Sequence, residues 1–364
     1  MLVAIETSCD ETAVSVFDVA RVLAGDDILD DGVIKTETLA SQIRLHEQYG
    51  GVVPELAARE HITSLPILFE KALKDSSIGV NDLSAIAVTK GPGLKGCLLV
   101  GLCFAKALSY SLKKPLLALN HMEGHIFACE LVPKNERATY PCIALVVSGG
   151  HTQLVLIQGF RKYKVIATTR DDAAGEAFDK SATLLGLPYP GGPALSKRAT
   201  NGDSNKFKFP IGVLNDSSSF SFSGLKTAVL KTVKALKENG ELKSKDVDDI
   251  SASVQLAIVK ALVEKTFNAC RQYGVSSLLL TGGVAANPLL RTMCAERAKE
   301  LGISFVVPPT KWCTDNATML GALALRIIEK DPSPYTSWKA CKGMLGPDVS
   351  MEVGAVARWP LSEI

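Results

Sequence analysis

The chain has 364 residues, of which 47% are hydrophobic and 21% are charged, and its formal net charge is +2. This composition is typical of a globular protein with a sizeable core, and the length allows two domains of roughly 150 residues each. The near-neutral charge excludes a protein that binds nucleic acid through its overall charge, so such binding must come from a local patch or from partners.

The chain also shows no sign of secretion or membrane insertion. Nine cysteines are scattered without a Cys-x-x-Cys pair, which favours a reducing compartment over a disulfide framework. The strand-like start, Leu2–Ile5, has no basic region or cleavage site, so no signal peptide is expected. The most apolar region, 97–112, is interrupted by Lys106 and is too short to span a bilayer. We therefore expect a cytoplasmic protein.

The opening of the chain predicts a strand, a polar turn and a second strand. Leu2–Thr7 and Ala13–Phe17 are apolar, and the polar residues 8–12 lie between them. An acidic, turn-rich excursion follows at 24–35. A long, charged, helical region is then expected from Ala40 to Leu73.

A glycine-rich loop follows the next predicted strand, Leu83–Thr89, and leads into an apolar helix that ends near Leu112. The loop, residues 91–96, resembles a phosphate-binding P-loop. Cys97 stands where that motif needs lysine, and no Ser or Thr follows it. A tight strand-to-helix turn is therefore the better interpretation, although a helix amino end can still face an anion.

The second half of the chain repeats the opening pattern. Strands are predicted at Cys142–Val147 and Gln153–Ile157, with the polar turn 148–152 between them. The repeat predicts a duplicated domain with a cleft between the halves.

A further strand, Ser277–Thr281, enters a glycine turn, and Asn287 then begins a helix with Pro288 in its first position. Other helices are predicted at 171–185, from Gly191 onward, at 225–237, at 250–273 and from Ala317. The proline-rich tail after Asp331 is expected to follow the surface without regular structure.

Two histidines stand four residues apart directly after the apolar run Leu116–Leu119. Asn120 is a suitable N-cap for the helix that carries His121 and His125. Positions four apart differ by only about 40° around a helix. Both imidazoles therefore leave the same face, at the carboxyl end of a strand, where open α/β sheets bind ligands. The pattern indicates a metal half-site; two half-buried histidines at a helix start are the alternative.

A third ligand must come from elsewhere in the chain. Asp315 has the right type and context, in a turn between the strand-like 303–307 and a helix. Its alternative role is that of N-cap for the helix that begins at Ala317, and the sequence leaves both open.

The spacing argues against a zinc protease. That class places its catalytic Glu directly after the first His, whereas Met122 stands there in this chain. Glu123 points about 200° around the helix from His121. It is better explained as a capping-box partner of Asn120.

The turn Ser148–Thr152 offers backbone amides and hydroxyls that could hold a phosphate or a ribose. Glu176 and Asp179, at an acidic helix start, could contact sugar hydroxyls. Taken alone, these two acids are better explained by the helix dipole.

Ten segments stand in order along the chain and together resemble one family. They are IETSCDET, HEQYGGVVPELAAREH, GPGL, NHMEGH, VSGGHT, GEAFDK, PGGP, FSGLKT, TGGVAAN and CTDNA. They are similar to the motifs of TsaD, the bacterial threonylcarbamoyltransferase once labelled a glycoprotease, and the resemblance extends to the terminal RWPL.

The resemblance implies an α/β fold of the actin/Hsp70/sugar-kinase type, with two ribonuclease-H-like lobes and a nucleotide and metal cleft between them. We expect an N-terminal lobe over 1–130 with a helical insertion near 35–75. A C-terminal lobe over 131–330 would have a helical insertion near 170–250. The tail, 331–364, would pack back on the body.

The resemblance also implies the reaction: transfer of threonylcarbamoyl from threonylcarbamoyl-AMP to the exocyclic amine of the adenosine 3′ of the anticodon, in tRNAs that read ANN codons. Similar proteins bind one iron or zinc ion through residues that match His121, His125 and Asp315, and Fe(II) is the expected ion. The implied substrate contacts are Val146, Val147, Ser148, Gly149, Gly150, Asp179, Gly192 and Asn287. Glu11, in the first turn, is the candidate general base.

The sequence is also compatible with two other functions: a small-molecule kinase of the same fold and a non-catalytic partner subunit. The expected partners are tRNA, a TsaB-like paralogue and a TsaE-like ATPase, with a homodimer as a further option and no membrane. The region Ala40–Leu73 is the expected TsaB contact. Candidate phosphate contacts are Arg161, Lys162, Lys164, Lys197 and Arg198, for which a solvated face is the alternative.

Overall fold

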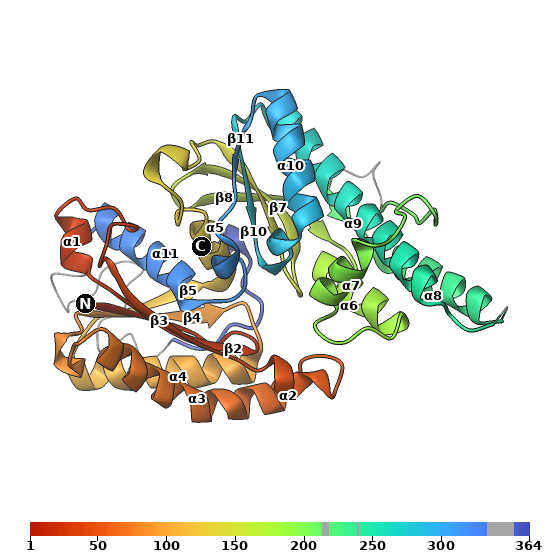
Figure 1. The fold of residues 1–364 in the computed structure, drawn as a ribbon. Helices are drawn as coiled ribbons and strands as arrows, with labels where there is room; N and C mark the ends of the chain where they lie inside the picture. The colour runs from red at the N-terminus through yellow and green to blue at the C-terminus, as the bar shows by residue number, and fades with distance from the viewer. Residues whose placement is uncertain (213–217, 239, 333–352) are drawn as a thin grey trace. The chain divides into compact units, whose positions relative to one another are not determined.

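The computed structural model describes residues 1–212, 218–238, 240–332 and 353–364 (Figure 1). The chain divides into two compact units. The N-unit comprises Met1–Arg44, Val52–Arg137 and Asp315–Ile364, and the C-unit comprises Leu45–Gly51 and Ala138–Thr314.

The N-unit is built on a five-stranded mixed sheet. Its strands, in spatial order, are β3 (Ile34–Ser41), β2 (Glu11–Phe17), β1 (Leu2–Glu6), β4 (Ala85–Gly91) and β5 (Leu116–Asn120). β2 is antiparallel to β1 and β3, whereas β4 and β5 continue parallel to β1. The strands β1 and β4 are almost wholly buried, because their near-continuous apolar runs are covered on both faces.

Helices cover both faces of this sheet. Figure 1 shows α3 (Pro54–Asp75) and α4 (Lys95–Leu112) side by side on one face, and α11 (Ala317–Lys330) on the other. α5 (His121–Ala128) follows β5 directly and packs against α11. The shorter helices of the N-unit are α1 (Val19–Leu23), η1 (Val80–Asp82), η2 (Lys134–Glu136) and η5 (Leu361–Glu363). The boundary between the two units falls within α2 (Ile43–Glu47), after Arg44.

The C-unit repeats this topology. The strand order is β11 (Ser304–Val306), β10 (Ser277–Thr281), β6 (Cys142–Val147), β7 (Thr152–Gly159), β8 (Lys162–Thr169) and β9 (Ser219–Phe220). β6, β7 and β8 are antiparallel, and β10 and β11 continue parallel to β6. This is the order of the N-unit sheet with one added edge strand, so the duplication expected from the repeated strand–turn–strand pattern is confirmed.

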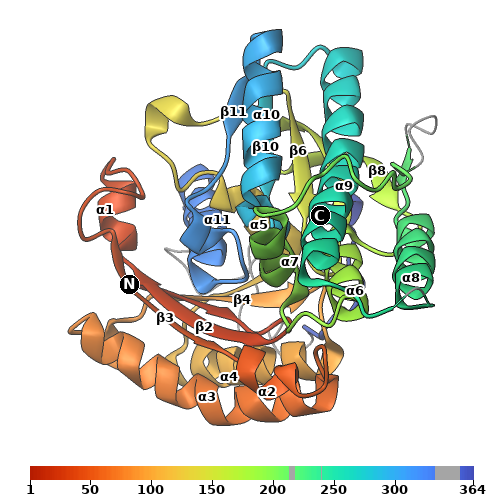
Figure 2. The ribbon, with the colours of Figure 1, turned by 45° about the vertical axis from the view of Figure 1, so that its right-hand side comes forward.

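The helices of the C-unit are α6 (Ala174–Leu184), α7 (Gly191–Ala199), α8 (Ser223–Glu238), α9 (Ser244–Tyr273) and α10 (Pro288–Leu301), with η3 (Gly283–Ala286) and η4 (Thr310–Trp312) in the connections. α9 supplies much of the core, since residues from Ile250 to Cys270 are mostly buried. Figure 2 shows α6, α7 and α8 grouped around one end of α9.

The structure differs from the sequence prediction at β3. The sequence predicts a surface excursion and then a helix near residue 40, whereas Ile34–Ser41 pairs with β2 as an edge strand. Lys35, Glu37 and Thr36 make this segment polar, and a half-exposed edge strand needs no continuous apolar run. The helices of the insertion begin later, at Ile43 and Pro54.

The domain boundaries also differ. The sequence predicts one lobe over 131–330, whereas the main segment of the C-unit is Ala138–Thr314 and the C-unit also includes Leu45–Gly51. α11 belongs to the N-unit because its apolar face packs on β1 and β2. Gly321 marks the closest approach, opposite the ring of Phe17.

Replacing Gly321 with alanine is expected to destabilise the protein by about 1–3 kcal/mol, the usual cost of an overpacked core. A Cβ at this position would lie 1.9 Å from the buried Phe17 ring. Gly224 in α8 is the matched control, because no atom lies within 4 Å of its Cβ position. Gly224 is the second residue of α8, so alanine there should change the free energy of unfolding far less than alanine at Gly321. Chemical denaturation of both variants measures the difference, and equal effects would contradict this packing.

The described part of the tail contacts the N-unit. The amide of Val356 donates to Lys90 O at 2.9 Å, and Asn120 Nδ2 donates to Trp359 O at 2.9 Å. The ammonium of Lys90 lies 4.7 Å from the centre of the Trp359 ring. Residues 353–364 therefore lie along the carboxyl ends of β4 and β5. The rest of the tail, 333–352, lies outside the described residues.

One described helix, α4, is long and apolar enough to cross a membrane by length and composition alone. One side of it, including Leu98, Leu102 and Ala105, is buried in the N-unit core. Core helices pass the same test, so this is weak evidence for a membrane span.

Candidate metal centre and substrate turns

The two predicted histidines begin a short helix at the end of a buried strand. Asn120 ends β5 and caps α5, and its Oδ1 accepts from the amides of Met122 and Glu123 at 2.9 and 3.1 Å. The predicted N-cap is therefore confirmed. The cap sets the start of the helix, so that His121 and His125 lie one turn apart, with ring centres separated by 4.7 Å.

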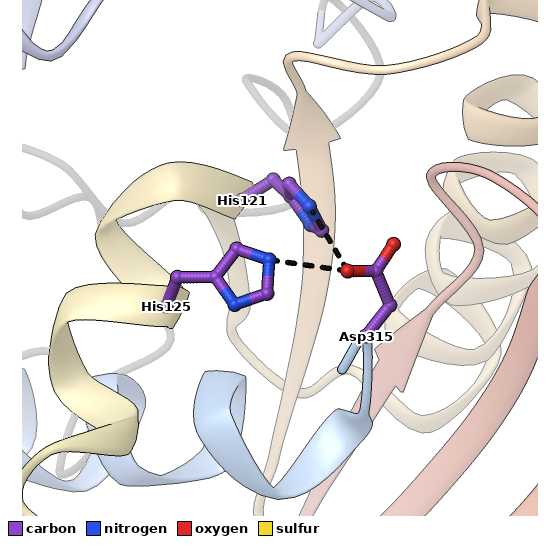
Figure 3. Close-up of side chains that lie close together, drawn as sticks. All are labelled: His121, His125 and Asp315. Atoms are coloured by element: carbon purple, nitrogen blue, oxygen red, sulfur yellow. Dashed lines mark hydrogen bonds and ion pairs between the residues drawn. The ribbon is translucent and has the colours of Figure 1, made fainter. Parts of the chain in front are cut away.

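A carboxylate from a distant part of the chain completes this group. Asp315 Oδ1 lies 3.1 Å from His125 Nε2 and 3.5 Å from His121 Nε2. Figure 3 shows both rings pointing toward this oxygen. All three side chains belong to the N-unit.

The three donors have the spacing of a metal site. Their candidate ligand atoms all lie within 4.8 Å of one another. Atoms bound to one zinc ion at about 2.0–2.2 Å lie about 3.0–3.5 Å apart, which matches both distances to Asp315. Two imidazoles and one carboxylate are a ligand set that leaves coordination positions open for substrate. The residues therefore fit a metal ion.

The alternative role of Asp315 is ruled out by its neighbour. Asn316 is the N-cap of α11, and its side chain accepts from the amide of Met319 at 2.8 Å. Asp315 is thus placed just before the cap, with its carboxylate directed to the histidines.

Glu6 lies behind His121 and was not among the predicted site residues. Its Oε2 accepts from His121 Nδ1 at 3.1 Å and from the hydroxyl of Thr89 at 2.6 Å, and its Oε1 accepts from the amide of Ser8 at 2.5 Å. Because the carboxylate can only accept, Nδ1 carries the proton and Nε2 faces Asp315. This carboxylate–histidine pair is the usual support of a metal-bound imidazole.

The electrostatics agree with this arrangement. Burial would lower the pKa of His121, but the charges of Asp315 and Glu6 raise it to about 9. Burial opposes ionisation of Glu6, yet the His121 charge and hydrogen bond lower its pKa. The two carboxylates therefore attract positive charge to this ring, which a metal ion on Nε2 would supply in place of a proton.

The turn after β1 adds negative charge near the same place. Burial, with the charges of Asp10 and Asp315, raises the pKa of Glu11 well above its usual range. A cation held by the three ligands would offset this concentration of carboxylates.

The turn itself is held by a histidine of α3. His61 is fully buried, and its Nε2 lies 2.9 Å from Cys9 O, while its Nδ1 lies 2.7 Å from the hydroxyl of Thr12. A carbonyl can only accept, so Nε2 carries the proton and Nδ1 accepts from Thr12. Burial lowers the pKa of His61, which agrees with a neutral ring.

In the C-unit, the predicted phosphate turn is held by backbone hydrogen bonds at Ser148, whereas Gly149 and Gly150 are exposed. Ser148 N donates to His151 O at 2.8 Å, and Gly175 N donates to Ser148 O at 3.2 Å. A Cβ added to Gly149 or Gly150 would meet no atom within 4 Å. The backbone of these two glycines is therefore accessible to a ligand.

The second glycine turn lies directly beside the first. Gly282 has a φ of +92°, and a Cβ there would lie 2.3 Å from Val147 O. Only glycine allows both this conformation and this close approach.

The other predicted substrate residues already have partners within the C-unit. Asp179 Oδ1 accepts from the amide of Gly192 at 3.0 Å, which joins two of them directly. Asn287 caps α10 by accepting from Leu290 N at 3.1 Å, and its Nδ2 donates to Gln255 Oε1 at 2.8 Å. Gln255 was also not predicted, because nothing in the pattern of a long helix marks it.

The comparisons with known proteins identify the family. A family model described as tRNA N6-adenosine threonylcarbamoyltransferase, TsaD, matches residues 33–322. The chain belongs to the TsaD family. A curated relative from Thermosipho africanus with the same name is 44% identical over 341 residues, which is 93% of this chain and 98% of the relative. Another, from Anaeromyxobacter sp. (strain Fw109-5), is 47% identical over 321 residues, 88% of this chain and 92% of the relative.

Solved structures support the fold class of this TsaD family member. Full-length HypF, in its phosphate- and nucleotide-bound form, is similar with a TM-score of 0.55 at 14% identity. The likeness covers 90% of this chain and 47% of HypF. HypF from T. kodakarensis gives a TM-score of 0.54 at 16% identity, with 89% and 47% covered. The expected α/β fold of the actin/Hsp70/sugar-kinase type, with two ribonuclease-H-like lobes, is confirmed.

Proposed function

We propose that this TsaD family member transfers threonylcarbamoyl from threonylcarbamoyl-AMP to the exocyclic amine of the adenosine 3′ of the anticodon, in tRNAs that read ANN codons. The observation that carries the proposal is the family match over residues 33–322, which include all three candidate ligands. The relatives carry the transferase name, which leaves the kinase and the non-catalytic subunit without support.

The reaction needs an activated carbonyl, a positioned amine and a place for the leaving group. The adenosine amine attacks the carbamoyl carbon, the new C–N bond forms, and the bond from that carbon to the phosphate oxygen breaks to release AMP. The amine loses one proton. The exposed backbone of Gly149 and Gly150 suits the phosphate, on which negative charge accumulates as the bond breaks.

The remaining substrate contacts are proposed from their motif positions and their rigidity. Asp179 is oriented by the amide of Gly192, and Asn287 by Gln255 and the helix that it caps. Residues held in this way lose little freedom when a ribose binds, so their contribution is to position the adenylate.

The metal is proposed to be Fe(II), with zinc as the alternative, since both accept two imidazoles and one carboxylate. His121, His125 and Asp315 would hold it. When bound, it supplies a Lewis acid that polarises the carbonyl or orients the phosphate. Glu11 is the candidate base for the amine proton, because it lies on the turn next to this group.

Purified protein, supplied with its partners, threonylcarbamoyl-AMP and tRNA, should produce tRNA that contains threonylcarbamoyladenosine. Nucleoside mass spectrometry after digestion detects the product. Release of ADP from ATP that depends on a small molecule and needs no tRNA would instead support the kinase.

A TsaB-like paralogue is proposed to bind the outer side of α3 and α4. These two helices expose large apolar residues: Ile62 and Ile67 of α3 are each 62% exposed, and Tyr110 of α4 is 63% exposed. Exchanging both isoleucines for aspartate should abolish co-purification with the paralogue. Leu301→Asp, on the exposed side of α10, is the control. An intact complex in the double variant would defeat this placement.

A TsaE-like ATPase, a homodimer and a cytoplasmic location complete the proposal, and they rest on the resemblance. Analytical ultracentrifugation of the chain alone and with each partner separates the homodimer from mixed complexes.

A further inference from the structure

Helix α8 is fixed firmly in the C-unit. Its buried side consists of Leu225, Val229 and Val233, which lie in the core. Asp171 Oδ1 accepts from the amides of Phe222 and Ser223 at 2.7 and 3.3 Å. Hydrogen bonds from these neighbours lower the pKa of Asp171 although burial opposes the shift. α8 is therefore a rigid element.

The opposite side of α8 carries an unusual run of charge. Lys231, Lys234 and Lys237 are exposed and spaced three residues apart. Within the described part of the chain, none of the three lies in a salt bridge. Glu238, four residues after Lys234, stands in the less favourable order for a helical pair.

Several cations on other helices of this protein pair with an acid on the same helix. The pairs are Lys71–Asp75 at 2.6 Å, Glu176–Lys180 at 2.7 Å, Lys245–Asp249 at 2.8 Å, Arg297–Glu300 at 2.8 Å and Arg326–Glu329 at 2.6 Å. Like charges at such spacing destabilise a helix by roughly 0.2–0.5 kcal/mol per pair. Lys237 lies in the last turn of α8 and complements the helix dipole, whereas Lys231 and Lys234 bring like charges close together without forming a salt bridge.

Two of the basic residues singled out in the sequence are already engaged. Arg198 Nε pairs with Asp248 at 2.6 Å, and Lys164 lies over the ring of Tyr273 at 5.9 Å. They are less available to a polyanion than the lysines of α8.

We propose that the exposed face of α8, defined by Lys231, Lys234 and Lys237, binds backbone phosphates of the tRNA substrate. The inference rests on the proposed function. A chain with a net charge of +2 needs a local concentration of cations to hold a polyanion. α8 packs against α6, the helix that carries Asp179, as Figure 2 shows. tRNA phosphates on α8 would thus lie on the same rigid part of the C-unit as the proposed adenylate contacts.

The test is the salt dependence of tRNA binding by the full chain with its partners. Each phosphate contact contributes roughly 0.7–0.9 to the slope of log K against log salt concentration. The variant K231Q/K234Q/K237Q should lower that slope by about 2–3 and weaken binding roughly 10- to 100-fold near physiological salt. Glutamine keeps the helix propensity, so α8 should still form.

A control variant distinguishes an effect of the α8 lysines on tRNA binding from an effect of the lower net charge. K74Q/K299Q/K330Q removes the same charge from exposed lysines of α3, α10 and α11. It should leave the slope close to that of the wild type. Equal slopes for the two triple variants, or an unchanged slope for the α8 variant, would overturn the proposal.

Steady-state kinetics distinguish this inference from the proposed function. The α8 variant should raise KM for tRNA while kcat at saturating tRNA stays the same. If the wild type modifies tRNA and KM does not change, the inference alone fails. If the wild type makes no modified tRNA, the proposed function fails whatever the binding result.

Discussion

Replacing Asp315 with alanine is expected to remove the bound metal and to reduce threonylcarbamoyl transfer by more than roughly 100-fold. This is more than the roughly 10- to 100-fold loss that is usual when a residue supporting a metal ligand is replaced. Asp315 Oδ1 is the atom that lies between the two Nε2 atoms, at 3.1 and 3.5 Å. Without it, two imidazoles remain, and the donor set loses its negative charge. Metal per chain after dialysis and the yield of modified tRNA measure the two effects.

Glu296→Ala is the control for Asp315→Ala. Glu296 is an exposed acid of α10 in the C-unit. Its replacement with alanine removes the same charge and leaves the candidate ligands unchanged. It should retain both metal and activity. A stoichiometric metal ion in Asp315→Ala would show that the ion is held elsewhere.

Replacing Glu6 with glutamine is expected to weaken metal binding by about 10- to 100-fold, the usual effect of changing the partner of a ligand histidine. Glu6 accepts the Nδ1 proton of His121 and directs Nε2 toward Asp315. Glutamine retains the shape but removes the charge that makes the imidazole a better ligand. Competition with a chelator measures the dissociation constant.

Thr89→Val is the matched comparison for Glu6→Gln. It removes one hydrogen bond to Glu6 but keeps the carboxylate beside His121. Its effect on the dissociation constant should be clearly smaller, and thermal unfolding of both metal-free variants checks that the fold is intact. Wild-type affinity in a folded Glu6→Gln variant would contradict the supporting role of Glu6.

Much of the fold could be predicted because the strands of the two sheets are apolar and bounded by turn residues. Cys142–Val147 and Ser277–Thr281 have the predicted bounds, and Asn287 caps its helix with Pro288 in the first position. The edge strand β3 could not be predicted, since a half-exposed strand carries no apolar run. The assignment of α11 to the N-unit could not be predicted either, because the apolar face of a helix does not reveal which sheet it covers.

The three candidate metal ligands were predictable from local spacing only in part. His121 and His125 follow from helix geometry and the Asn120 cap. The role of Asp315 could not be predicted from the sequence, because only tertiary packing decides whether Asp315 or Asn316 caps α11. Glu6 had one available signal, an acid at the end of an otherwise apolar strand, whose full burial requires a partner.

The most direct test compares the nucleosides of tRNA treated by the wild type and by Asp315→Ala, with equal threonylcarbamoyl-AMP, partner proteins and metal. We expect threonylcarbamoyladenosine in the wild-type digest and almost none in the variant digest. Equal amounts of threonylcarbamoyladenosine from both proteins would contradict a transferase that depends on His121, His125 and Asp315.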